Sequence, residues 1–285
     1  MEKKLFKLCE EVNSKTNTKL YSLIGLVLLM LIWYLITYFQ VLPSKILPNP
    51  VDVITSIPVM FKENDLLGNM WYSISLNFSS YFYAIIISLP LGLMIALVPI
   101  NRIVFGKYID SLRFLPIPAL SGIFIAILGL GFNMKVSFLA FSLIIYILPA
   151  VANKVYDLQN PANDKDYVYL QTIKTLGASS WQKIRYVYFP YVTSKISSEI
   201  INLTGVSWSY VVIAELLNKD GGIGALINTM SRQSRTAEMY ALLFLIIFIG
   251  VCQDIILRKA DTILFPYKYN KRGINWNWLK KLIYK

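Results

Sequence analysis

Long apolar runs separated by polar connections constrain this chain more than any other feature of its sequence. The first run covers residues 20–39, and a helix of about 20 apolar residues is long enough to cross the hydrocarbon core of a bilayer. Of all residues, 56% are hydrophobic and only 15% are charged, whereas a soluble domain averages roughly 25% charged residues. The sequence therefore predicts an all-α polytopic membrane protein.

Six segments are predicted to be transmembrane helices. They are residues 20–39, 71–98, 112–130, 136–152, 191–217 and 239–257. The first is longer than a signal-peptide core and has no small-residue cleavage site after it, so we interpret it as an uncleaved helix. This divides the chain into an N-terminal segment (1–19), a six-helix transmembrane domain (20–257) and a basic, aromatic tail (258–285).

Prolines and charges indicate how the spans are connected. Pro43, Pro48 and Pro50 forbid a continuous helix until about Val51, after which an amphipathic surface helix is expected. Residues 101–113 are predicted to be a basic loop, and Asn133 and Lys135 to mark a short outer connection. Pro116 and Pro118 interrupt the third span, which is tolerable where neighbouring helices or water satisfy the freed carbonyls.

The distribution of basic residues predicts the orientation. With the N-terminus inside, 22 of the 28 Lys and Arg residues fall on the inner side and 6 on the outer side. Lys and Arg are enriched in cytoplasmic loops of membrane proteins. Both termini, and the connection between the fourth and fifth spans, are therefore expected to be cytoplasmic.

Two spans carry a polar or small-residue stripe along one helical face. The second has Ser73, Asn77, Ser80, Ala84 and Ser88, and the fifth has Ser194, Ser198, Asn202, Gly205 and Ser209. Such faces mark either helix packing or a water-filled path, and both interpretations stay open. Glu199 lies near the inner end of the fifth span and Glu215 near its outer end, and intramembrane carboxylates are functional candidates by default. Candidate pathway residues are therefore Ser73, Asn77, Ser80, Ser198, Glu199, Asn202, Ser209 and Glu215.

The connection at about residues 165–190 is the longest polar stretch between spans. Gly177 lies at its centre and suits an elbow between two short helices, because glycine tolerates positive φ. Pro190 opens the fifth span, where its missing N–H has no partner in any case. On a membrane protein, such an elbow is a candidate docking site for a soluble partner.

The same stretch resembles the EAA loop of ABC importer permeases, in which Glu-Ala-Ala precedes a glycine and an Ile-x-Leu-Pro box. Gly177 matches the glycine and Val187-Tyr188-Phe189-Pro190 fills the last box, while Gln171 stands where the family has glutamate. In that family the loop forms a coupling helix that seats in a separate ATPase subunit. The residues assigned to this loop by resemblance are Gln171, Thr172, Thr175, Leu176, Gly177, Ala178, Ser179, Ser180, Trp181 and Pro190.

A second match lies at the end of the fifth span. Trp208, the triplet Ala214-Glu215-Leu216, and then Gly222 and Gly224 are similar to the signature of nitrate/taurine/sulfonate-type permeases. The resemblance implies a type I ABC importer permease fold in the inner membrane, paired with a second permease copy. It also implies two ATPase subunits, an external substrate-binding protein, and a small anionic or vitamin-like solute.

The chain lacks the residues and motifs that several kinds of chemistry require. The chain has no histidine, no P-loop and no nucleophile motif, so we expect no metal, no cofactor, no catalytic residue and no ATPase activity of its own. Cys9 and Cys252 imply no disulfide framework, and nucleic-acid binding is not expected. Two alternatives stay open: an ion-coupled secondary transporter that uses Glu199, Glu215 or Asp254, and an assembly protein without transport.

Overall fold

The computed structural model describes residues 18–162, 164–217 and 220–269, and these form helices and short connections without a strand. The longer helices are α1 (Thr18–Tyr38), α2 (Pro50–Glu63), α3 (Leu66–Leu97), α4 (Pro99–Ser111), α5 (Ser121–Leu128), α6 (Phe132–Gln159), α7 (Asp164–Thr175), α9 (Phe189–Asn202), α10 (Thr204–Leu216), α11 (Ile223–Arg232) and α12 (Thr236–Leu264). One-turn helices are η2 (Leu112–Phe114), η3 (Ile117–Leu120), α8 (Ser180–Lys183), the π-helical η4 (Ile184–Tyr188) and η5 (Pro266–Tyr269). The predicted all-α class is confirmed.

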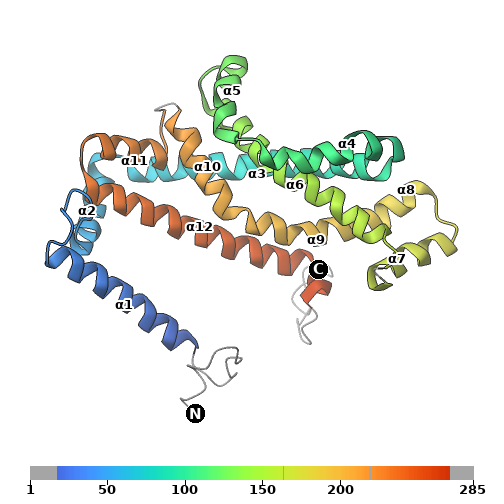
Figure 1. Cartoon of the computed structure of the whole chain (residues 1–285), viewed down its shortest axis with the longest axis horizontal. Coiled ribbons are helices and arrows are strands. Elements are labelled where there is room, and N and C mark those ends of the chain that lie inside the picture. The colour runs from blue at the N-terminus through green and yellow to red at the C-terminus, as the bar shows by residue number, and fades with distance from the viewer. Residues whose placement is uncertain (1–17, 163, 218–219, 270–285) are drawn as a thin grey trace, which may run out of the picture.

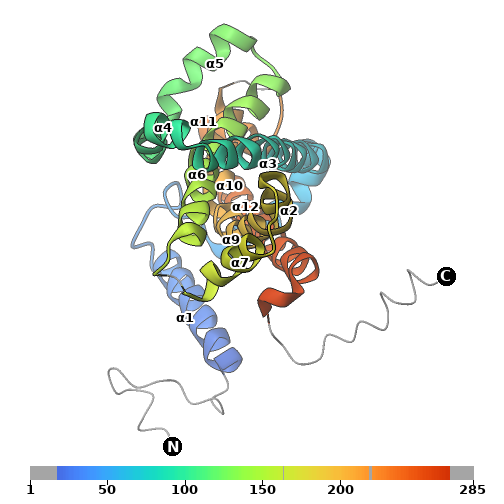
Figure 2. The same cartoon turned by 90° about the vertical axis from the view of Figure 1, so that its right-hand side faces the viewer.

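The helices form an elongated bundle with two distinct ends (Figure 1). The α7–α8 elbow lies at one end, and α2 and α11 lie at the other. α3 and α6 pack along each other through the middle of the bundle. α1 and α5 project from opposite sides of it, as both views show (Figure 2).

Membrane-spanning length is met by four helices of the described chain, namely α1, α3, α6 and α12. A fifth span is formed if the bent pair 99–114 and 117–128 counts as one. The predicted fifth span is split into α9 and α10, which meet at Leu203 and together run back along the bundle (Figure 1). The six predicted passes thus agree approximately with the structure. Four of them are continuous helices, and the third and the fifth are broken.

The prediction of a basic loop at residues 101–113 is wrong, whereas the predicted interruption of the third span at Pro116 and Pro118 is present. Residues 99–111 form α4, and the chain then bends by 99° before α5. Leu115, which precedes Pro116, is extended with ψ 128°, because the proline ring disfavours the α region for the residue before it. Pro116 and Pro118 therefore lie at a sharp bend that separates α4 from α5.

The predicted outer connection at Asn133 and Lys135 is also wrong. Both residues lie in the first turn of α6, and the Lys135 side chain is completely buried. Its ammonium donates to the hydroxyl of Tyr72 at 3.3 Å and lies 5.1 Å from the centre of that ring. A buried charge of this kind needs hydrogen bonds and counter-charges, and the tertiary structure provides them.

The boundaries of the other helices differ less from the predicted ones. α2 begins at Pro50, where the side chain of Asn49 accepts the N–H of Val51 at 3.0 Å, so a helix is present where the surface helix was predicted. α12 continues to Leu264, past the expected end at 257. The N-terminal segment up to residue 17, and the tail from residue 270, which includes Trp276 and Trp278, lie outside the described residues.

α3 and α6 lie close together at Gly92. A Cβ added there would lie 2.5 Å from Cγ1 of Val151 and 3.3 Å from the carbonyl oxygen of Leu148. Val151 is fully buried, so it cannot move aside without disturbing the core.

We predict that Gly92→Ala lowers the stability of the purified protein in detergent by about 1–3 kcal/mol, the usual cost of overpacking a core. Gly25→Ala is the matched control, because a Cβ at Gly25 meets nothing within 4 Å. Thermal unfolding followed by tryptophan fluorescence compares the two variants. Equal unfolding midpoints would contradict the assigned α3–α6 contact.

Candidate functional site: an elbow and a polar groove

The predicted elbow at Gly177 is present as two short helices joined at a glycine with φ +69°. The N–H of Gly177 donates to the carbonyl of Lys174 at 3.0 Å, and the N–H of Ala178 donates to that of Ile173 at 3.3 Å. These two bonds form a Schellman motif, which ends a helix on a left-handed residue. The glycine is thus required by backbone conformation, since the space around it is open.

α8 begins immediately after this turn with a capping box. The Ser179 hydroxyl accepts the N–H of Gln182 at 3.3 Å, and the Gln182 side-chain oxygen accepts the N–H of Ser179 at 2.7 Å. A capping box satisfies two helix-terminal donors that otherwise lack partners. α8 then continues through η4 into α9, so the elbow is directly connected to the fifth span.

Exposed apolar side chains cover the elbow. Leu176 is 78% exposed and Trp181 is 68% exposed, although both lie on a polar end of the bundle. Gln171, Thr172, Thr175, Gly177, Ser179 and Ser180 are also exposed, while Ala178 and Pro190 are half-buried. Large apolar residues gathered on a polar surface are typical of a protein interaction site.

The elbow is held to the rest of the bundle by side-chain hydrogen bonds and an ion pair. Tyr191 donates to the carboxylate of Asp166 at 2.8 Å, and Lys195 forms an ion pair with the same carboxylate at 3.3 Å. Tyr188 is buried and accepts the side-chain N–H of Gln159 at 3.2 Å. α7 and α9 are therefore held together, and a force on the elbow reaches both α6 and α9.

The predicted pathway residues divide into two groups. Ser73, Asn77, Ser80 and Glu215 are buried in the interior of the chain. Glu199, Asn202 and Ser209 are exposed along one face of α9 and α10, and Ser198 is half-buried. Only the exposed group lies on a surface that this chain leaves open.

Glu215 caps the start of α11. Its Oε2 accepts the N–H of Gly224 at 2.6 Å, and its Oε1 accepts the Ser73 hydroxyl at 2.5 Å. Ser73 Oγ in turn accepts the N–H of Ile223 at 2.9 Å. A Cβ at Gly222 would lie 2.2 Å from the Glu215 carboxyl group, which explains physically why a glycine follows the Ala-Glu-Leu triplet.

A second buried network connects three helices at mid-depth. The Asn77 amide donates to Ser207 at 3.1 Å and accepts from the Gln253 amide at 3.2 Å. Gln253 also accepts the indole N–H of Trp208 at 2.7 Å, while Ser80 donates to the carbonyl of Leu76 at 2.7 Å. Gln253 is not among the predicted pathway residues, although a lone glutamine within an apolar span is a usable signal.

Ser198 belongs to a cluster at the end of α12. Lys268 donates to Ser198 at 2.7 Å, to Ser197 at 3.0 Å and to Asp261 at 3.0 Å. Tyr269 donates to the same Asp261 carboxylate, and this bond raises the pKa of the tyrosine. The cluster holds η5 against α9, next to the elbow.

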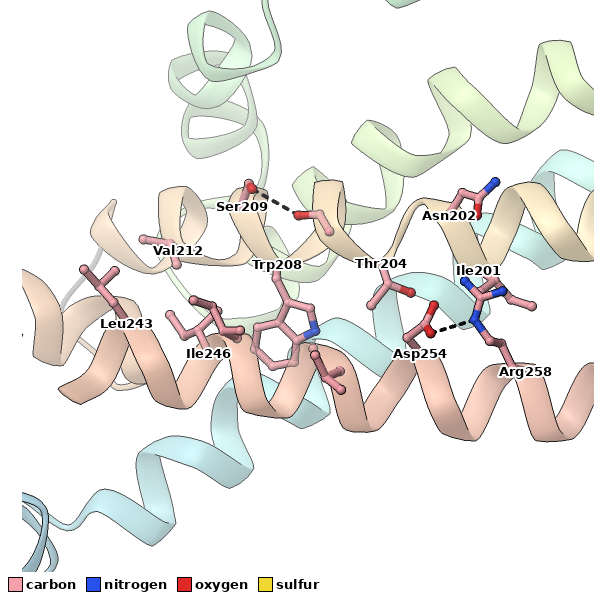
Figure 3. A pocket seen from close by; sticks show the side chains of 14 residues that line it. Ile201, Asn202, Thr204, Trp208, Ser209, Val212, Leu243, Ile246, Asp254 and Arg258 are labelled. Carbon is pink, nitrogen blue, oxygen red and sulfur yellow. Dashed lines mark hydrogen bonds and ion pairs between the residues drawn. The ribbon is translucent and has the colours of Figure 1, made fainter. Parts of the chain in front are cut away.

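A groove of about 860 Å³ runs between α9–α10 and α12 (Figure 3). Its lining includes two of the exposed candidates, Asn202 and Ser209, together with Thr204 and an ion pair between Asp254 and Arg258 at 2.7 Å. Arg258 had been assigned to the tail, because the sequence alone did not show that α12 continues through it.

Several membrane-spanning helices, an exposed elbow at one end and a groove with a charged end beside a broken helix are together typical of multi-pass transport proteins. Residues 88–262 match the family of binding-protein-dependent transport system inner membrane components. The chain belongs to this family and is a membrane permease subunit of an ABC importer.

Individual relatives agree with this assignment. The chain is 22% identical to the taurine transport system permease protein TauC of Escherichia coli (strain K12), with 85% of this chain and 87% of that protein covered. It is also 22% identical to the putative aliphatic sulfonates transport permease protein SsuC of Bacillus subtilis (strain 168), covering 93% and 95% of the two chains. The carnitine transport permease protein OpuCD of Listeria monocytogenes is 26% identical, over 73% and 89%.

Among solved structures, a chain of the MetNI methionine ABC transporter in an inward-facing conformation superposes with a TM-score of 0.59. The two are 17% identical, and the match covers 73% of this chain and 99% of that one. The predicted type I permease fold is confirmed. The relatives support the importer interpretation and not the ion-coupled alternative.

We predict that Glu215→Ala destabilises the start of α11. The change leaves the buried hydroxyl of Ser73 and N–H of Gly224 without this acceptor, and each unsatisfied donor costs about 1–3 kcal/mol. Hydrogen exchange should accelerate at Gly224, and the unfolding midpoint should fall.

Glu199→Ala is the matched control, because it removes an exposed carboxylate from the same pass. Glu215→Gln should lie between the two, since it retains one carbonyl acceptor. An unchanged exchange rate at Gly224 in Glu215→Ala would contradict the capping role.

Proposed function

We propose that this chain forms half of the translocation pathway of an ATP-driven importer for a small solute, and that α7–α8 is its coupling helix. The observation that carries the proposal is the exposed elbow around Gly177, fixed to the bundle through Asp166 and Tyr188. Two separate ATPase subunits would bind the elbows of two permease copies. An extracytoplasmic binding protein would deliver the solute at the opposite end.

The charge distribution supports a cytoplasmic elbow. Most basic residues fall on the side of the α7–α8 connection, as expected for cytoplasmic segments. The contacts of η5 put the end of α12 beside the start of α9, since Tyr267 donates to the carbonyl of Pro190 at 3.3 Å. The C-terminus would therefore lie on the cytoplasmic side as well.

The broken fifth pass supports a rocking mechanism. Closure of the ATPase pair would draw the elbows together, and α8 transmits that movement directly through η4 into α9. Membrane transporters commonly alternate access by rigid-body rocking of one helix bundle against another, and the break at Leu203 would let α9 and α10 change their relative angle during such a movement. Exposed Asn202 and Ser209 on this pass are our candidates for lining the pathway between the two copies.

The solute is proposed to be a small molecule bearing a sulfonate or a comparable anionic group. Relatives named for taurine and aliphatic sulfonates align over most of the chain. In this scheme the binding protein selects the solute, and the permease provides a path of compatible polarity.

We predict that deletion of residues 175–180 abolishes ATP-dependent uptake of taurine, used as the probe, by the complete transporter in proteoliposomes. Gly177→Val should have a similar but smaller effect, because a β-branched residue at φ +69° is strained by roughly 1–2 kcal/mol. Gly177→Asn is the matched control, since asparagine tolerates left-handed backbone.

ATPase copurification and uptake are measured on the same preparations. Loss of both in the deletion variant, with retention in Gly177→Asn, is the expected pattern. Undiminished uptake in the deletion variant would refute the coupling role.

A further inference from the structure

The groove between α10 and α12 combines an apolar wall with a charged end. Leu243, Ile247 and Val251 of α12 line the apolar wall. Asp254 and Arg258 follow on the same helix, one and two turns later (Figure 3). The opposite side carries exposed polar or small residues of the fifth pass. Its volume of about 860 Å³ is within the range of small-molecule sites.

The ion pair in this groove is only partly used within the chain. Arg258 donates through Nε to Oδ2 of Asp254 at 2.7 Å, and the two side chains are 60% and 33% exposed. In the described part of the chain, the Nη groups of Arg258 and Oδ1 of Asp254 make no hydrogen bond. Charged groups exposed on a membrane-spanning helix face water or a ligand, so both can bind a solute.

Thr204 also lines the groove, but its side chain is only 5% exposed and its Oγ1 is enclosed by the protein. A solute in the groove therefore does not reach this hydroxyl without a rearrangement of the chain. The exposed Asp254–Arg258 pair provides the charged groups that a solute can contact directly.

We propose that this groove binds a small zwitterion, with its acidic group on Arg258 and its cationic group on Asp254. An anion alone would be repelled by Asp254, and a cation alone by Arg258, so the adjacent opposite charges favour a molecule that carries both. The inference rests on the proposed function, because a water-filled pathway gives such a solute access to the groove.

The experiment measures binding without depending on transport. The full transporter is prepared with Cys9→Ser and Cys252→Ser, and a reporter cysteine is introduced as Asn202→Cys in the groove. Ile263→Cys, exposed on the same helix as Arg258 but outside the groove, serves as the control. The labelling rate with a charged maleimide is measured with four two-carbon probes: taurine, β-alanine, ethanesulfonate and ethanolamine.

Taurine and β-alanine should slow labelling at position 202 and leave position 263 unchanged, while the probes with one charge protect weakly. Protection by taurine alone would identify the acidic group as sulfonate, and protection by β-alanine alone would identify it as carboxylate. Arg258→Gln should weaken taurine protection about tenfold, the loss expected for one charge-assisted hydrogen bond. Asp254→Asn should allow ethanesulfonate to protect as well as taurine.

Two results would overturn the proposal. If each substitution changes protection by all four probes equally, the ion pair is only structural. If no small probe protects position 202 but added phosphatidylethanolamine does, the groove is a lipid site.

Uptake on the same preparations separates the two proposals. ATP-dependent uptake without protection at position 202 would refute the groove site and leave the coupling proposal intact. Protection without any effect of ATP on uptake would refute the coupling proposal instead.

Discussion

The structure depends on one constraint, which is that polar groups inside a membrane protein must be satisfied by the protein itself. Glu215 shows how this is achieved. Its carboxylate accepts from Ser73 and from the start of α11, so one acidic residue joins three helices. Asn77 and Gln253 do the same at mid-depth through a chain of amide hydrogen bonds. These networks determine which helices lie next to one another, a choice that apolar surfaces alone leave open in lipid.

The same constraint separates the structural polar residues from those available for transport. Ser73 and Asn77 use their hydrogen-bonding capacity within the chain. Asn202 and Ser209, in contrast, face a groove, and the Asp254–Arg258 pair lies at its charged end. The polar residues of the two similar periodic patterns therefore serve two purposes, and burial distinguishes them. The elbow at Gly177 lies at the far end of the same pass. A single broken helix therefore connects the proposed docking site of the ATPase to the proposed translocation pathway.

Much of this organisation could be predicted from the sequence, because it depends on local patterns. Gly177 and Ser179 lie in a turn and a cap that only a few residue types form well, so the elbow was predictable. Residues 101–113 were predicted wrongly as a loop, since the basic residues that mark a connection between spans do not show whether its backbone is helical. Lys135 was placed in a loop because its burial depends on Tyr72, which is far away in the sequence.

The sequence by itself determined that the chain crosses a membrane several times and carries a helix–glycine–helix elbow, because span length and turn chemistry are encoded in contiguous residues. Only the tertiary structure decided that Glu215 is a helix cap, that Ser73 faces inward, and that Arg258 lies in a groove with Thr204. Each of these depends on which helices become neighbours. That outcome is set by hydrogen bonds and close contacts between residues more than a hundred positions apart, such as Ser73 and Glu215, and no local pattern records them.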